Sequence, residues 1–213
     1  MTASHAAVVL AAGGSTRLGR PKQLLTRDGE TLVHRAARLA LASGAARVLV
    51  IVGAHADALR EAVRDLPVEC HDNAAWASGL GSSVGVAAAA LAAHDGPTLL
   101  LVCDQPALEE AHLRVLLDAA CGSASGCAAT RLDLRLGIPV VVPPLVLRRA
   151  GALQGDRGLR DLLNADGAVV AACEAPDLAF DIDTQGDIAT AVARGWLDAE
   201  FPTGAREGPG PSG

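Results

Sequence analysis

A glycine-rich loop follows the first apolar run of the chain and ends on Lys22. Gly13, Gly14 and Gly19 allow tight turns that bring backbone N–H groups close to a ligand, and Ser15 adds a hydroxyl donor. Lys22 is the single lysine beside 17 arginines, which indicates a need for a compact ammonium rather than a planar guanidinium. The alternative is that biased composition removed the other lysines and that Lys22 remained by chance. We expect this loop to bind a polyphosphate group.

The spacing of the loop excludes two common phosphate-binding motifs. A P-loop places Lys directly after its second glycine, but Arg20 and Pro21 stand between Gly19 and Lys22. The glycines also lack the Gly-x-Gly-x-x-Gly spacing of a dinucleotide-binding fingerprint. The loop therefore predicts a phosphate site of another type.

Acidic residues that suit a metal ion follow later segments. Asp104 comes two residues after the apolar run at 98–102, and Asp181 and Asp183 alternate with Ile182. Ligands of open α/β sheets lie beyond the carboxyl ends of the strands, which would bring Asp104 to the same edge as the loop. Mg²⁺ on nucleotide phosphates takes one or two protein carboxylates. The alternative is that these residues are helix caps or turn residues.

Small polar residues precede an Ala-rich helical stretch. The segment runs from Asn73 through Gly79 to Ser82 and Ser83. Backbone donors and hydroxyls at a helix N-terminus can contact a pyrimidine edge or a ribose. Either serine is equally suited to be an N-cap.

Strand and helix signals alternate along the chain, which predicts an α/β fold with a mostly parallel central sheet covered on both faces. The last strands need not be parallel. Residues 200–213 hold four Gly and three Pro, and we expect them to be a disordered tail after a single domain at 1–199. Strands are expected at 6–11, 48–52, 68–71, 98–102, 127–130, 138–142 and 169–173, and helices at 31–42, 56–64, 82–93, 109–120, 159–164 and 185–194.

Composition narrows the class of protein. The net charge of −6 and the absence of a basic stripe exclude a nucleic-acid polymer as partner. Five cysteines without a Cys-x-x-Cys pair predict neither a zinc site nor a disulfide framework. No apolar stretch approaches the ~20 residues that span a bilayer. We expect a cytoplasmic protein that does not bind membranes.

Residues 10–25 resemble the signature Leu-Ala-Ala-Gly-x-Ser-x-Arg-(Met/Leu)-Gly-x-x-Lys-x-Leu-Leu of the molybdopterin nucleotidyltransferases. Residues 73–84, the Asp-Gln-Pro run at 104–106 and the Asp-Ile-Asp-Thr run at 181–184 fit the same family in order, so the resemblance covers about residues 6–194. It implies a single-domain, three-layer Rossmann-like nucleotidyltransferase fold. At position 12 the chain resembles the cytidylyl branch of the family, which has Ala there, whereas the guanylyl branch has Gly.

The resemblance implies a CTP:molybdopterin cytidylyltransferase, which transfers CMP from Mg-CTP to the terminal phosphate of molybdenum cofactor and releases pyrophosphate. It implies Mg²⁺ as cofactor, Asp104 and Asp183 as metal ligands, and Arg17, Lys22 and Asp104 as catalytic residues. A molybdenum hydroxylase or its maturation chaperone would be a protein partner. The expected nucleotide-binding residues are Leu10, Ala11, Ala12, Gly13, Gly14, Ser15, Lys22, Asn73, Gly79, Ser82, Ser83 and Asp104.

The acceptor side departs from the family. Ile138 stands where the family has Asn or His before Pro-Val, which removes a polar contact. The run at 155–160 resembles the family's Gly-Asp-x-Gly-Ala-Arg turn and would bring Arg157 or Arg160 near a phosphate, while Asp156 is equally suited to be an N-cap. The alternatives are a transferase for another phosphorylated small molecule such as a sugar phosphate, a GTP-using guanylyltransferase, and a non-catalytic nucleotide- or cofactor-binding maturation factor.

Overall fold

The computed structural model describes residues 4–153, 158–165 and 167–199. The tail expected at 200–213 and the expectation for Arg157 and Asp156 lie outside the described residues. Within them, no helix is both long and apolar enough to cross a membrane.

A mixed sheet forms the centre of the described part of the chain, with strand order β5-β4-β1-β6-β8-β7-β9. Among these strands only β8 runs antiparallel to its neighbours, since β6 and β7 both pair with it antiparallel while β9 pairs parallel to β7. The prediction of a mostly parallel sheet is therefore confirmed. The strands are β1 (Ala6–Leu10), β4 (Arg47–Val52), β5 (Glu69–Asp72), β6 (Thr98–Val102), β7 (Ala128–Leu132), β8 (Arg135–Val142) and β9 (Ala171–Glu174).

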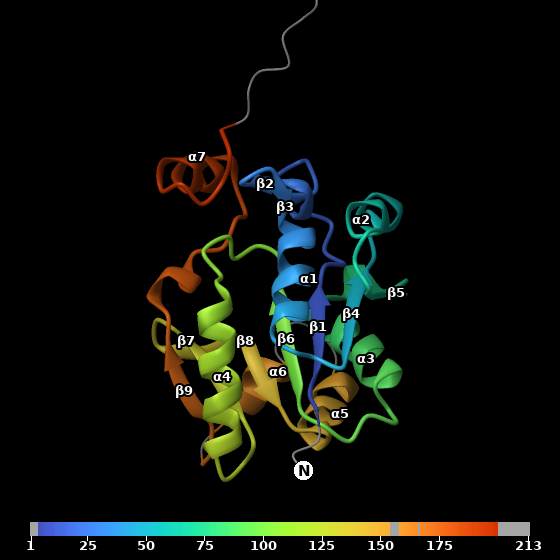
Figure 1. Ribbon diagram of the computed structural model, residues 1–213, viewed down its shortest axis with the longest axis vertical. Coiled ribbons are helices and arrows are strands. Elements are labelled where there is room, and N and C mark those ends of the chain that lie inside the picture. The colour runs from blue at the N-terminus through green and yellow to red at the C-terminus, as the bar shows by residue number, and fades with distance from the viewer. Residues whose placement is uncertain (1–3, 154–157, 166, 200–213) are drawn as a thin grey trace, which may run out of the picture.

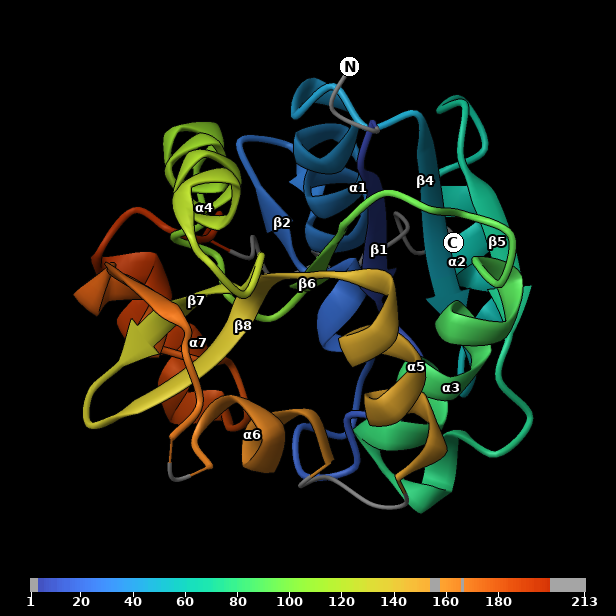
Figure 2. The ribbon, with the colours of Figure 1, turned by 90° about the horizontal axis from the view of Figure 1, so that it is seen from below.

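Helices cover both faces of the sheet and complete three layers (Figure 1 and Figure 2). One face carries α1 (Leu32–Ala42), α2 (Ala56–Ala62) and α4 (Glu110–Gly122). The other carries α3 (Leu80–Ala90), α5 (Pro144–Ala152) and α6 (Gly158–Leu163).

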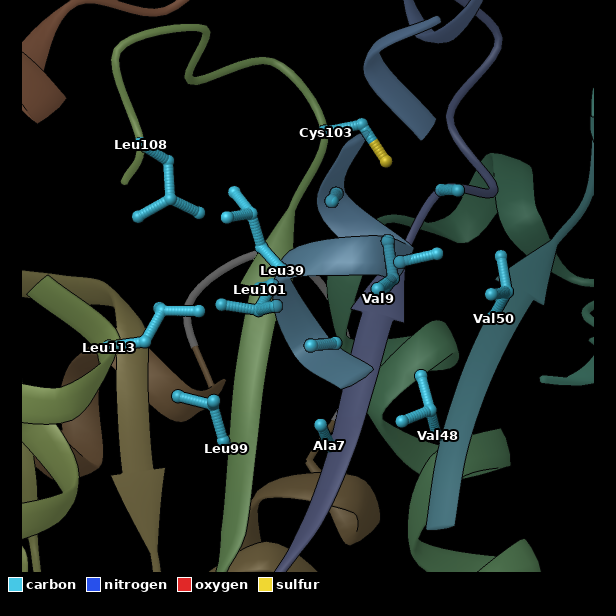
Figure 3. Packing of buried hydrophobic residues seen from close by; sticks show 14 of the residues in the cluster. Ala7, Val9, Leu39, Val48, Val50, Leu99, Leu101, Cys103, Leu108 and Leu113 are labelled. Carbon is cyan, nitrogen blue, oxygen red and sulfur yellow. The ribbon is translucent and has the colours of Figure 1, made fainter. Parts of the chain in front are cut away.

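The two faces follow from the two-residue period of the strands. In β1, Ala7 and Val9 face the α1 side, while Val8 and Leu10 face the α3 side. Figure 3 shows Ala7 and Val9 beside Leu99 and Leu101 of β6, with Leu39 of α1 over them. Because both faces of these strands are buried, their sequences are continuous apolar runs, and these runs located the strands well.

A third apolar cluster lies at the carboxyl edge of the sheet, where α7 (Gln185–Ala193) packs over the loop after β1. The short hairpin of β2 (Thr26–Arg27) and β3 (Glu30–Thr31) lies beside it. Asp198 joins the two: its backbone N–H donates to Thr26 O at 2.8 Å and its carboxylate accepts from two N–H groups of the hairpin turn. These contacts fix α7, the hairpin and the loop after β1 relative to one another at the edge of the sheet where we expect ligands to bind.

The sequence did not predict the β2–β3 hairpin or α5, nor the short 3₁₀ helices. The hairpin strands have two residues each, too short for a periodic pattern. Helix α5 begins at Pro144, directly after Pro143, and a pair of prolines reads as a loop although Pro is favoured in the first helical turn. Gly151 lets α5 approach α3 closely, since a Cβ there would lie 2.9 Å from Ala88 Cβ.

Candidate active site

Side chains close the loop that follows β1 into a fixed shape. Gln23 is 2% exposed, and its Nε2 donates to Ala11 O at 3.0 Å and to Gly13 O at 2.7 Å. Ser15 has a φ of 50°, and its Oγ accepts from the backbone N–H of Lys22 at 3.1 Å. The loop is therefore held on both sides, with Lys22 at the start of the short 3₁₀ helix η1 (Lys22–Leu24).

A cavity of about 630 Å³ opens between the carboxyl ends of β1 and β6. These strands are neighbours in the sheet, and the chain leaves β1 for β4 on the other side, which makes this the switch point where open α/β sheets bind ligands. A Cβ built on Gly13 would meet no atom within 4 Å, whereas one on Gly14 would lie 2.7 Å from the ring of Trp76. Gly13 thus leaves room for a ligand, and Gly14 leaves room for the tryptophan.

Nine of the expected nucleotide-binding and catalytic residues line this cavity, while four support it from behind. Ala11 packs into the α1 face of the core, and Ser15 is engaged within the loop. Asn73 and Ser82 also lie outside the lining. The nine lining residues are Leu10, Ala12, Gly13, Gly14, Arg17, Lys22, Gly79, Ser83 and Asp104.

Asn73 organises the N-terminus of α3. It is 3% exposed, and its Nδ2 donates to Ser82 Oγ at 2.8 Å and to Ser83 Oγ at 3.0 Å. The hydroxyl of Ser82 then donates to Gly79 O at 2.7 Å. Within the described residues the hydroxyl hydrogen of Ser83 has no protein acceptor, so Ser83 can donate to a ligand in the cavity.

Lys22 lies between the two carboxylates expected to bind metal. Its Nζ is 2.6 Å from Asp104 Oδ2 and 3.0 Å from Asp183 Oδ1, and Arg17 contacts the other oxygen of Asp183 at 2.8 Å. Burial by itself would lower the pKa of Lys22, but Asp104 and then Asp183 outweigh it and raise the pKa above its usual value. The ammonium is therefore charged at neutral pH.

Asp181 adds a third carboxyl to this edge. Loss of hydration and, after it, the neighbouring Asp104 carboxylate raise the pKa of Asp181 to about 7. The residue nevertheless keeps part of its surface exposed to solvent. Ile182 is fully buried, and its N–H donates to Asp104 O at 3.1 Å. This bond ties the two acidic segments together.

The donor set fits a hard divalent cation. Asp104 and Asp183 direct one carboxylate oxygen each at a common cationic atom, and oxygen ligands are those that Mg²⁺ and Mn²⁺ prefer. In the described ranges no group of three or more His, Cys, Asp or Glu residues has the arrangement of a metal site. An ion here would take protein carboxylates for part of its coordination and phosphate oxygens or water for the rest.

A second cavity, of about 400 Å³, adjoins the first along Asp104, Leu80 and Val102. Gln105 fixes its floor: the side chain is 5% exposed, and its Nε2 donates to Ile138 O and to Leu178 O, both at 3.0 Å. One amide thus connects the Asp104 loop, β8 and the segment that leads to Asp181. Two cavities that meet at a carboxylate can hold two substrates whose reacting groups meet there.

The chain matches the family model of the MobA-like NTP transferase domain over residues 7–172. The protein belongs to this family. This MobA-like NTP transferase is a nucleotidyltransferase, as the resemblance of the glycine-rich loop predicted, and its three-layer fold matches solved nucleotidyltransferase structures.

The MobA-like NTP transferase is similar to one curated protein and to two solved structures of a second protein. It is 38% identical to nicotine blue oxidoreductase of Paenarthrobacter nicotinovorans over 168 residues, 73% of this chain and 79% of that one. Rv0371c of Mycobacterium tuberculosis has a TM-score of 0.78 and 26% identity, and the match covers 91% of this chain and 100% of that one. The manganese complex of Rv0371c gives a TM-score of 0.74, 25% identity, and coverage of 89% and 98%.

Sequence reasoning gave no role to several residues of the MobA-like NTP transferase site. Gln23 follows Lys22 directly, but nothing in that position shows that its amide bonds back to the loop. Trp76 lines the cavity and packs on Gly14, a contact that only the fold creates. Gln105 lies inside the Asp-Gln-Pro motif, and this position was the one signal in the sequence that could have indicated a role for it.

Proposed function

We propose that this MobA-like NTP transferase transfers CMP from Mg-CTP to the terminal phosphate of a molybdopterin-type acceptor and releases pyrophosphate. The observation that carries the proposal is the pair of cavities that meet at Asp104, one lined by the glycine-rich loop and the other by β8 and α6. The first has the lining expected for a nucleoside triphosphate, and the second has room for a separate small molecule.

The transfer requires little covalent chemistry from the protein. An oxygen of the acceptor phosphate forms a bond to the α-phosphorus of CTP, and the bond from the α-phosphorus to the bridging oxygen breaks, so that pyrophosphate leaves with the electron pair. A terminal phosphate is mostly dianionic at neutral pH, with a second pKa near ~6, and needs no general base. Catalysis then depends on orientation and on stabilising negative charge.

The residues of the site suit these two tasks. Lys22 and the amides around Gly13 and Gly14 would hold the triphosphate, and Arg17 would lie against the transferring phosphate. Asp104 and Asp183 would hold Mg²⁺, which supplies charge neutralisation between the phosphates when bound. Lys22 and the ion share the same two carboxylates, so an ion bound there frees the ammonium to contact phosphate oxygens.

A pyrimidine donor is favoured by the lining around α3. Ala12 places a methyl group in this cavity where the guanylyl branch has Gly, and Ser83 offers a hydroxyl donor from a rigid, buried position. We therefore expect CTP to be preferred over GTP by at least about tenfold in kcat/KM, equivalent to ~1.4 kcal/mol.

Pyrophosphate release tests the proposal directly. The protein is incubated with each of the four NTPs, with Mg²⁺ or Mn²⁺, and with molybdenum cofactor or a sugar phosphate as acceptor. Release that requires CTP, metal and molybdenum cofactor supports the proposal, and Asp104→Asn should abolish it while Asp177→Asn, an exposed acid away from both cavities, should not.

Other outcomes replace the proposal. Preference for GTP would make the protein a guanylyltransferase, and turnover with sugar phosphate alone would change the acceptor. Tight nucleotide binding without turnover would favour a non-catalytic maturation factor. Because one relative is named as an oxidoreductase, a parallel assay follows the redox conversion of nicotine blue, and turnover in that assay alone would overturn nucleotidyl transfer.

A further inference from the structure

Three cavities follow one another along the carboxyl edge of the sheet. The nucleotide cavity and the acceptor cavity share Asp104, while the acceptor cavity and an outer cavity of about 600 Å³ share Arg135 and Arg160. Neither arginine lines the nucleotide cavity, and Asp104 does not line the outer one. The acceptor cavity therefore has an acidic end at Asp104 and a basic end at Arg135 and Arg160 that opens outward, with Asp133 also in the lining of the acceptor cavity and Asp161 in that of the outer one.

An apolar wall lies between these two ends, formed by eight of the eighteen residues that line the acceptor cavity. Aliphatic side chains from α3, β6, β7, β8 and α6 supply it, and Ile138 is 9% exposed, at the place where a polar side chain would have offered a contact. A sugar ring with many hydroxyls would lose hydrogen bonds to water here without gaining protein partners. The aliphatic lining residues are Leu80, Val84, Val102, Leu132, Leu136, Ile138, Leu159 and Leu163.

The guanidinium groups of the two arginines at the basic end have no protein partner in the described part of the chain. Ten other arginines there form ion pairs or cation–π contacts. The guanidinium groups of Arg135 and Arg160 make no such contact within the described ranges, although both side chains border the same two cavities. They are available to an anion.

One amide holds the backbone at both arginines. Asn164 Oδ1 accepts from Leu136 N at 2.9 Å, and Asn164 Nδ2 donates to Leu136 O at 2.9 Å and to Arg160 O at 2.8 Å. Leu136 directly follows Arg135 in β8, and Arg160 lies in α6. The strand and the helix that carry the two cations are thus clipped together, which lowers the entropy lost when both bind one ligand.

We infer that the acceptor is a two-ended molecule: a reacting phosphate at Asp104, an apolar ring-sized body against Ile138, and a second anionic group bound by Arg135 and Arg160. This rests on the proposed nucleotidyl transfer and adds the chemical class of the acceptor. Guanidinium groups bind carboxylate and phosphate through paired hydrogen bonds. On a chain with net charge −6, such a basic end would also keep the ligand in one orientation.

A matched pair of probes tests the second anionic group. Binding of 2-naphthyl phosphate and of 6-carboxy-2-naphthyl phosphate is measured by calorimetry in the presence of Mn²⁺. The two differ only in the distal carboxylate. We expect the carboxylated probe to bind at least about tenfold more tightly, ~1.4 kcal/mol, and to lose this preference as salt rises. Glucose 1-phosphate should bind more weakly than either.

Variants locate the effect. Arg135→Gln combined with Arg160→Gln should equalise the two naphthyl probes while changing the affinity for 2-naphthyl phosphate by less than about twofold. The matched control is Arg148→Gln combined with Arg149→Gln, which removes two exposed α5 arginines that line none of the three cavities. Ile138→Asn should weaken both naphthyl probes and leave their ratio unchanged.

The inference is overturned by equal affinity of the wild-type protein for the two naphthyl probes, or by a preference that survives the double arginine substitution. Calorimetry with Mn-CTP separates this from the proposed function. If CTP fails to bind while the carboxylated probe still binds through the arginines, cytidylyl transfer is contradicted. The inferred anion binding in the acceptor cavity is then still supported. Tight CTP binding with no probe preference contradicts only the acceptor class.

Discussion

Lys22 Nζ lies 2.6 Å from Asp104 Oδ2 and joins the loop after β1 to the loop after β6. Both side chains are largely buried, with 17% and 21% exposed, and Asp183 approaches the same nitrogen from the start of α7. One ammonium thus links three segments that are far apart in the sequence. Its size and position explain why a lysine is present in a chain that otherwise uses arginine.

Lys22→Arg should lower kcat/KM by at least about 100-fold, ~2.7 kcal/mol at the transition state. A planar guanidinium is too wide to lie between two carboxylates that both approach one nitrogen within 3.0 Å. The measurement is steady-state pyrophosphate release at saturating metal. The reverse exchange on the surface, Arg148→Lys, serves as control. Activity of Lys22→Arg within about threefold of the parent, less than ~0.7 kcal/mol, would sink the assigned role.

Gly13→Ala should weaken nucleotide binding without affecting the fold. A Cβ at this position meets no protein atom within 4 Å and projects where the phosphates are expected. We expect the Kd for Mn-CTP to rise by at least about tenfold with an unchanged melting temperature. Gly122→Ala, which also meets no atom within 4 Å but lies at the end of α4, is the matched control. Normal CTP affinity in Gly13→Ala would show that the loop amides do not contact the nucleotide.

Arg27→Ala should loosen the loop that carries Asp104. Arg27 is 18% exposed, donates to Pro106 O at 2.7 Å and pairs with Glu109 at 2.8 Å. Its loss leaves a carbonyl of a buried residue unpaired, which should cost about 1–3 kcal/mol of unfolding free energy. The metal concentration for half-maximal activity should also rise, because Asp104 lies two residues before Pro106.

The control for Arg27 is Arg114→Ala, which breaks an exposed pair with Glu110 on α4. Such surface pairs contribute at most about 1 kcal/mol. Urea unfolding gives the stability of both variants, and Mn²⁺ titration of activity gives the metal dependence. If Arg27→Ala and Arg114→Ala shift the metal dependence equally, Arg27 supports the fold but does not position Asp104.

His34 should make stability depend on pH. Partial burial lowers its pKa, but hydrogen bonds to Glu30 at 2.6 Å and Asp65 at 3.2 Å outweigh this, and the net pKa is raised. The stabilisation is therefore complete below the unfolded-state pKa of ~6.5 and is lost as pH rises through the higher folded-state pKa. The difference in unfolding free energy between the parent and His34→Gln should shrink between pH 5.5 and pH 8.5, by up to about 1 kcal/mol. Asp65→Asn should reduce this change, and a difference that grows with pH would contradict the assignment.

The sequence predicted the positions of the sheet strands better than it predicted the elements around the site. Runs such as the one at β6 are buried on both faces, so burial shows in composition alone. Helix α5 was missed because Pro143 and Pro144 at its start read as a loop, and its close contact with α3 depends on glycines that meet only after folding. The site residues stay predictions, although the fold brings nine of them to one cavity and leaves Ala11, Ser15, Asn73 and Ser82 as its support.

The motifs in the sequence were enough to predict the family and the three-layer fold through their resemblance, and alternating apolar runs predicted a mostly parallel sheet, because such signals are local along the chain. That the loop with the lone lysine binds phosphate stays a prediction. Only the tertiary structure decided which groups meet. Asp104 and Asp183 are 79 positions apart in the sequence, and no local pattern shows that they converge on one ammonium. The same holds for Arg135 and Arg160, whose shared cavity exists because Asn164 ties β8 to α6. Such contacts depend on strand order and packing, which a one-dimensional pattern does not record.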